Sequence, residues 1–97
     1  MPNSIKAMMC EVGKKPYVKE IPNELESMQN FVGGYIETSF LTKDGLIIVC
    51  NEEGMFLNLP INRNLGVKIL GNFLVVRADG EEFASISDKD IEVLNRM

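Results

Sequence analysis

The stretch GNFLVVRADG, residues 71–80, decides the fold more than any other part of the chain. It contains an unbroken apolar run, residues 73–76, which is typical of a buried β-strand. Asp79 and Gly80 then supply a turn. We therefore predict that residues 71–78 form the last long strand and lie centrally in a sheet, with a short edge segment around Phe83.

Working outward, two hairpins are predicted upstream of this strand. Residues 5–12 and 17–21 read as strands on either side of a Gly-Lys-Lys-Pro turn. Residues 35–41 and 46–50 flank a Lys-Asp-Gly turn, and the second of them, LIIVC, reads as the more deeply buried strand. The five strands together predict a mainly antiparallel sheet.

Two short helices complete the predicted fold. Asn23 is a candidate N-cap for a helix that ends at Gly33-Gly34, with apolar residues at helical spacing between them. Ser87 is a candidate N-cap for a final helix that turns Ile91 and Leu94 toward the core. We predict one globular α+β domain over residues 1–97, of order roughly ββαβββα, with its sheet packed on one face.

Several ordered motifs resemble the domain-of-unknown-function 3846 family. The matching segments span nearly the whole chain: residues 32–37 (VGGYIE), 50–54 (CNEEG), 59–63 (LPINR), 71–76 (GNFLVV), 79–83 (DGEEF) and 85–91 (SISDKDI). The resemblance implies a small accessory protein of phages, plasmids or conjugative elements. It implies no particular activity.

Charge and composition exclude several classes of partner. Ten basic and fourteen acidic residues give a net charge of −4, and the basic residues are scattered, so we expect no nucleic-acid partner. Carboxylates that mimic a nucleic acid remain an alternative, weakened by the lack of an acidic run. No stretch is apolar enough for a membrane span or a signal peptide, so we expect a cytoplasmic protein with reduced thiols.

The absence of histidine removes the commonest general base and metal ligand. Cys50 precedes Glu52 and Glu53, whose charges would raise the pKa of its thiol if they lay close to it. The acidic stretch 79–82 lacks the spaced ligands of a calcium loop. We therefore expect a non-enzymatic protein without a cofactor or a catalytic metal.

Residues 51–66 are predicted to form a long exposed or pocket-lining loop, with a helical turn beginning just after Pro60. Amide side chains can read a base or a ribose, and a guanidinium can pair with phosphate in a bidentate manner. Pro60 would stiffen the turn, and Tyr35 or Phe56 could supply an aromatic face. The predicted ligand-binding residues are Tyr35, Glu37, Asn51, Asn58, Pro60, Asn62 and Arg63.

A structural use of the same residues is equally compatible with the sequence. Asn62 could cap the next turn, and Arg63 could pair with an acid such as Glu37. Two functions therefore stay open, ahead of a third, a metal- or carboxylate-dependent enzyme built from acids such as Glu52, Glu53 and Asp79. The first is sequestration of a small nucleotide-derived signalling ligand for counter-defence. The second is inhibition of a host defence protein, such as a nuclease, through a sheet edge or an exposed apolar face.

Association with further copies of the chain is also expected. A 97-residue domain with 45% hydrophobic residues gains noticeably from burying a shared face. The sequence therefore predicts a homo-oligomer.

Overall fold

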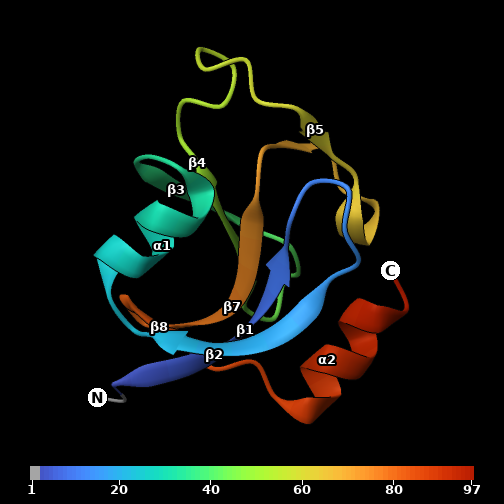
Figure 1. The fold of residues 1–97 in the computed structure, drawn as a ribbon. Coiled ribbons are helices and arrows are strands. Elements are labelled where there is room, and N and C mark those ends of the chain that lie inside the picture. Colours follow the sequence, from blue (N-terminus) through green and yellow to red (C-terminus); the bar gives the residue numbers. More distant parts are fainter. Residues whose placement is uncertain (1–2) are drawn as a thin grey trace.

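Strand β7 (Phe73–Asp79) runs through the middle of the sheet in the computed structural model, which describes residues 3–97 (Figure 1). Val75 shows why this strand is central, because it pairs with Met8 on one side and with Ile48 on the other. Every pairing in the sheet is antiparallel. The strands follow the order β2 (Tyr17–Pro22), β1 (Ser4–Cys10), β7, β4 (Leu46–Asn51) and β3 (Ile36–Phe40), and β8 (Glu82–Ala84) pairs with the end of β7.

Both faces of the sheet are buried, which corrects the expectation of packing on one face. Helix α1 (Leu25–Val32) covers the face that carries Leu74 and Val76. Helix α2 (Asp88–Asn95) and the segment around residues 65–69 cover the face that carries Phe73 and Val75. The unbroken apolar runs of β4 and β7 follow from this arrangement, since a strand covered on both sides has no solvent face to make polar.

The two helices differ in how well their starts were predicted. Ser87 caps α2 as expected: its hydroxyl accepts from the Asp90 backbone N–H at 3.1 Å, and the Asp90 carboxylate accepts from the Ser87 N–H at 2.8 Å. Helix α1 instead has Glu24 at its N-cap, without a side-chain cap, so the predicted N-cap at Asn23 is wrong. The Ser27 hydroxyl donates to the Pro22 carbonyl and so ties the first turn of α1 to the end of β2. Gly33, with φ of 83°, ends α1 as predicted.

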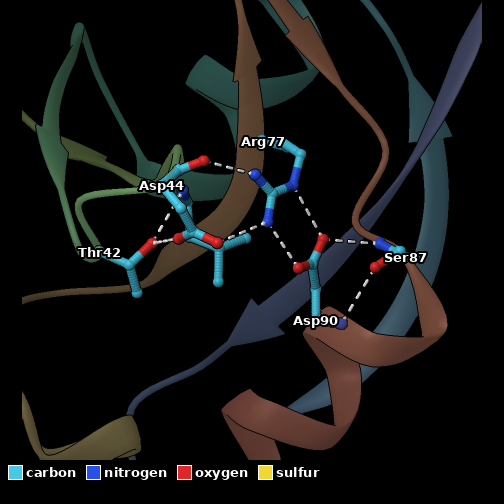
Figure 2. Close-up of polar contacts among 6 residues, drawn as sticks. Thr42, Asp44, Arg77, Ser87 and Asp90 are labelled. Atoms are coloured by element: carbon cyan, nitrogen blue, oxygen red, sulfur yellow. Dashed lines mark hydrogen bonds and ion pairs between the residues drawn. The ribbon is translucent and has the colours of Figure 1, made fainter.

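A charged contact fixes α2 against the sheet (Figure 2). Arg77 on β7 donates from Nε and Nη2 to the two carboxylate oxygens of Asp90, at 3.0 and 2.6 Å. Its Nη1 also donates to the Asp44 carbonyl in the β3–β4 turn at 2.7 Å. Strand, turn and helix are thereby held by one guanidinium, which is consistent with the preference of arginine for bidentate pairing.

The expected α+β class and the mainly antiparallel sheet with two helices are confirmed, and the element order broadly matches. Additional short elements lie beyond residue 60: β5 (Ile61–Asn62), the 3-10 turn η1 (Asn64–Gly66) and β6 (Ile69–Leu70). Strand β5, and not a helical turn, directly follows Pro60, because residues 61–62 pair with 69–70. No helix among residues 3–97 is long and apolar enough to cross a membrane.

Candidate functional site

The structure distributes five of the seven predicted ligand-binding residues among three separate hollows, and Asn58 and Pro60 line none of the three. Tyr35 shares a hollow with Leu57 near the end of α1. Glu37 and Asn51 line a second hollow under Met55 and Phe56. Asn62 and Arg63 line a groove that faces the β1–β2 turn. We had expected residues 58–63 to face Tyr35 and Glu37 across a pocket or a subunit interface. Within one copy of the chain these residues do not share a pocket, because the β5–β6 pairing directs residues 61–64 elsewhere. The arrangement across a subunit interface stays a prediction.

Asn51 and Asn62 are occupied within the protein. The buried Asn51 amide donates to the Val32 carbonyl at 3.0 Å, and its oxygen accepts from the Glu53 N–H at 2.7 Å. The buried Asn62 amide donates to the carbonyls of Cys10 and Gly71, at 2.9 and 3.0 Å. Both side chains hold backbone in place and leave little capacity to read a ligand.

Of the two structural alternatives, one is observed in part. The Asn62 side-chain oxygen accepts from the Asn64 N–H at 3.0 Å and so supports the turn that leads into η1, although Arg63, and not Asn62, is the N-cap of η1. A pairing of Arg63 with Glu37 is absent from the described residues, where the two side chains line different hollows.

Asn58 and Pro60 serve the turn that they occupy. Asn58 is exposed and has φ of 52°, a conformation that asparagine tolerates better than most residues. The Pro60 carbonyl accepts from the Gly71 N–H at 2.7 Å. The positive φ accounts for asparagine at position 58 without a ligand, whereas the Pro60 contact uses the main chain and does not depend on proline.

Three consecutive apolar side chains at the end of the β4–β5 loop are exposed, and we call them the apolar tip. Met55 is 83% exposed, Phe56 91% and Leu57 52%. The loop projects from the sheet between β4 and β5 (Figure 1). Exposed runs of this kind usually mark an interaction surface. The sequence suggested Phe56 as a possible aromatic face. The tip as a unit was not predicted, although the run MFL between Gly54 and Asn58 signals it.

The loop that carries the apolar tip is well ordered by backbone hydrogen bonds. Leu57 N–H donates to the Glu53 carbonyl at 2.9 Å, Asn58 N–H to Met55 at 3.1 Å and Leu59 N–H to Gly54 at 3.0 Å. At its base, a Cβ added to Gly54 would lie 3.0 Å from the Leu70 Cβ, so the loop packs closely on β6. The apolar side chains therefore stand on a fixed support.

Positively charged side chains lie together beyond the β4–β5 loop, where residues 61–64 face the β1–β2 turn. Lys14 and Lys15 in the β1–β2 turn and Arg63 after β5 line a groove of about 490 Å³, which we call the basic groove. The segments 12–16 and 61–64 supply all the lining residues, and none of these is acidic. The sequence placed the two lysines in a solvated turn and did not connect them with Arg63, because the contact is non-local.

The thiols are poorly suited to nucleophilic chemistry. Burial raises the pKa of the Cys10 thiol to about 12. Burial and then the charge of Glu37, which accepts a hydrogen bond from the Cys50 Sγ at 3.9 Å, raise the pKa of Cys50 to about 11. The acid beside Cys50 is thus Glu37 in place of the expected Glu52 and Glu53. Across residues 3–97, no three His, Cys, Asp or Glu side chains come together as a metal site.

Comparison with known families assigns the chain. A family model described as "Domain of unknown function (DUF3846)" matches residues 5–97. The chain belongs to this family. Searches of curated proteins and of solved structures each found no match. The function of this DUF3846 protein must therefore be argued from its own surfaces.

Proposed function

We propose that this DUF3846 protein is a non-enzymatic binding protein that docks onto another protein through its apolar tip. The observation that carries the proposal is the exposure of Phe56, 91%, between two further exposed apolar side chains. Burying an aromatic or aliphatic side chain of this size contributes about 1.5–3 kcal/mol. Three adjacent ones supply the central anchor that a protein interface requires.

The rigidity of the loop favours binding by this surface. Its backbone hydrogen bonds and the close packing of Gly54 on Leu70 are already formed in the free protein. A preorganised loop loses less conformational entropy on association than a flexible one. The apolar tip can therefore bind without refolding.

Charge indicates the chemistry of the partner. Glu52 and Glu53 are exposed directly before the apolar tip, and the whole chain carries a net charge of −4. The complementary surface is an apolar pocket with a basic rim. Nucleic-acid-binding proteins such as host nucleases offer such a rim, so we propose counter-defence by occlusion of such a factor in the cytoplasm of a bacterium that carries a phage or mobile element.

Sequestration of a nucleotide-derived ligand remains the second proposal. The positions of Asn51 and Asn62 weaken the version in which these amides read a nucleotide, since both are engaged internally. One observation favours a version in which cationic side chains, and not these amides, bind the ligand: Arg63 lies in the basic groove with Lys14 and Lys15.

A matched pair of variants tests protein binding. Phe56→Ser removes the centre of the apolar tip, whereas Phe40→Ser removes another exposed phenylalanine, 74% exposed, on strand β3. Each tagged protein is used to capture partners from a bacterial lysate, and any captured protein is purified and titrated directly. We expect Phe56→Ser to weaken binding at least about tenfold and Phe40→Ser to leave it unchanged.

Two results would contradict this proposal. One is the absence of any captured protein whose direct binding depends on Phe56. The other is equal loss of binding in Phe40→Ser, which would indicate general surface stickiness. Both serines replace exposed side chains, so thermal melts of the two variants should match that of the unmodified protein.

A further inference from the structure

We propose that the basic groove is a binding site for a small phosphate-bearing anion of nucleotide size. This inference concerns a different surface from the apolar tip and does not depend on protein docking. It deepens the second proposal above, because it names the site and the chemical class of the ligand. Three cationic side chains from two separate segments, Lys14, Lys15 and Arg63, line one groove of about 490 Å³. That volume falls in the range of small-ligand sites.

Arg63 differs from the two other arginines of the chain. Arg77 is paired with Asp90 at 2.6 Å, and Arg96 is paired with Glu92 at 2.6 Å. Within residues 3–97, no ion pair involves Arg63, which is exposed. A guanidinium without an internal carboxylate keeps its planar donors available for a bidentate bond to phosphate.

The two walls of the basic groove are fixed to each other by hydrogen bonds of asparagine side chains. Asn62 donates to the Cys10 carbonyl at 2.9 Å, and Asn64 donates to the Glu11 carbonyl at 2.9 Å. From the other direction, the Val12 N–H donates to the Asn72 side-chain oxygen at 2.9 Å. Residues 61–64 and the β1–β2 turn are therefore held side by side before any ligand arrives (Figure 1). Such preorganisation lowers the entropy lost on binding.

The neighbouring acid is already engaged. Glu11 accepts a hydrogen bond from the Tyr17 hydroxyl at 2.7 Å and lies 3.7 Å from the Lys14 ammonium. Tyr17, and then Lys14, lower the pKa of Glu11, so it is ionised at neutral pH. Lys14 is thus partly neutralised. Lys15 and Arg63 carry most of the attraction, which suits one or two phosphate groups.

The surrounding charge favours a small anion over a nucleic acid. A long polyanion would extend beyond the three cations onto a protein of net charge −4. A nucleoside phosphate can place its charged end in the basic groove without that repulsion. Its remaining part would lie against the apolar surface of Val12, Pro16 and Ile61, which also line the groove.

The test is a titration of the 15N-labelled protein at low ionic strength, first with inorganic phosphate and then with ADP. Binding is monitored by the change in the NMR chemical shifts of the backbone amides. We expect shifts confined to residues 12–16 and 61–64, and tighter binding of ADP than of phosphate. Arg63→Ala should weaken ADP binding about tenfold or more, because a charge-assisted bidentate contact is lost. Arg63→Lys should restore only part of the affinity, since an ammonium cannot form the planar pair.

Lys43→Ala is the matched control, since Lys43 is an exposed lysine in the β3–β4 turn that does not line the basic groove. Thermal melts establish that each variant is folded. The proposal is overturned if millimolar phosphate and ADP cause no shifts, or if Lys43→Ala weakens binding as much as Arg63→Ala. Tighter binding of a single-stranded oligonucleotide, with shifts spread beyond the groove, would also overturn it.

Discussion

Asparagine side chains near the β4–β7 connection link its backbone to other parts of the chain. Asn51 reaches the Val32 carbonyl, Asn62 reaches those of Cys10 and Gly71, and Asn64 reaches that of Glu11. Each of these hydrogen bonds gives a buried or half-buried carbonyl oxygen a partner in place of water. Among the described residues, no buried side-chain nitrogen or oxygen lacks a partner.

Asn62→Ala tests this structural use at a single residue. The variant leaves the carbonyls of Cys10 and Gly71 and the Asn64 N–H without their side-chain partner. Unsatisfied buried groups cost about 1–3 kcal/mol each, partly relieved by water, so we expect the free energy of unfolding to fall by about 2–3 kcal/mol. Urea unfolding measures it. Asn58→Gly, which keeps the positive φ allowed, is the control and should change stability by less than about 0.5 kcal/mol.

An Asn62→Ala variant as stable as the unmodified protein would show that the amide is free for a ligand, as the sequence had suggested. The sequence could not decide between these uses. An amide pairs equally well with a nucleotide edge and with a carbonyl, and only the burial of Asn62 between residues distant in sequence selects the second.

At the scale of elements, one ion pair couples helix α2 to the sheet. The pKa of Asp90 is lowered from 3.8 to about 2. The largest cause is the hydrogen bond from the Arg77 side chain, and the Ser87 backbone and hydroxyl contribute as well (Figure 2), whereas burial has the opposite effect. A carboxyl whose pKa is lower in the folded state stabilises the fold above its unfolded pKa. That contribution is lost as the pH falls through the folded pKa.

Asp90→Asn should therefore remove a pH-dependent stabilisation. At pH 7 we expect the free energy of unfolding to fall by about 1–2 kcal/mol, because the charge-assisted pair and the capping box are weakened. Between about pH 4 and pH 2 the variant should lose stability less steeply than the unmodified protein. The stability of the variant will still depend on pH, because the pKa of Asp44 is also lowered, by a hydrogen bond from Thr42 and then by the charge of Arg77. Urea titrations across that pH range test this, and identical slopes would contradict it.

Elements encoded locally were predictable, and those that depend on distant pairing were not. The start of α2 follows from Ser87 and Asp90 alone, and the centrality of β7 follows from its unbroken apolar run. Strands β5 and β6 consist of two residues each and exist only because they pair with each other, so no local pattern marks them. The helical turn expected just after Pro60 was wrong for this reason.

At the scale of the whole molecule, the candidate site was partly predictable. The sequence predicted an exposed loop within residues 51–66, and residues 52–60 are indeed a largely exposed turn region, because turn residues without apolar periodicity rarely form core. It could not separate the apolar tip from the basic groove, since Lys14 and Lys15 meet Arg63 only through the fold. Within one copy of the chain, the predicted ligand-binding residues lie on several distinct surfaces.

The predicted homo-oligomer stays a proposal that also concerns the apolar tip. A second copy could cover Met55, Phe56 and Leu57 in place of a different protein. In a two-fold arrangement of tip against tip, Glu52 and Glu53 would approach the same acids of the other copy, which disfavours that contact. We therefore expect a different protein, and not a second copy of this chain in a tip-to-tip dimer, to bind the apolar tip.

The most direct test of protein docking is the fluorescence of a Phe56→Trp variant. The chain has no tryptophan, so in the free protein the new indole reports on the apolar tip alone, and the emission of the partner by itself is subtracted from that of the mixture. We predict emission typical of a water-exposed indole in the free protein, independent of protein concentration, and a blue shift when the captured partner is added. Emission that is already blue-shifted and reverts on dilution would assign the tip to a homo-oligomer. A spectrum unchanged by a partner that binds would contradict docking through the apolar tip.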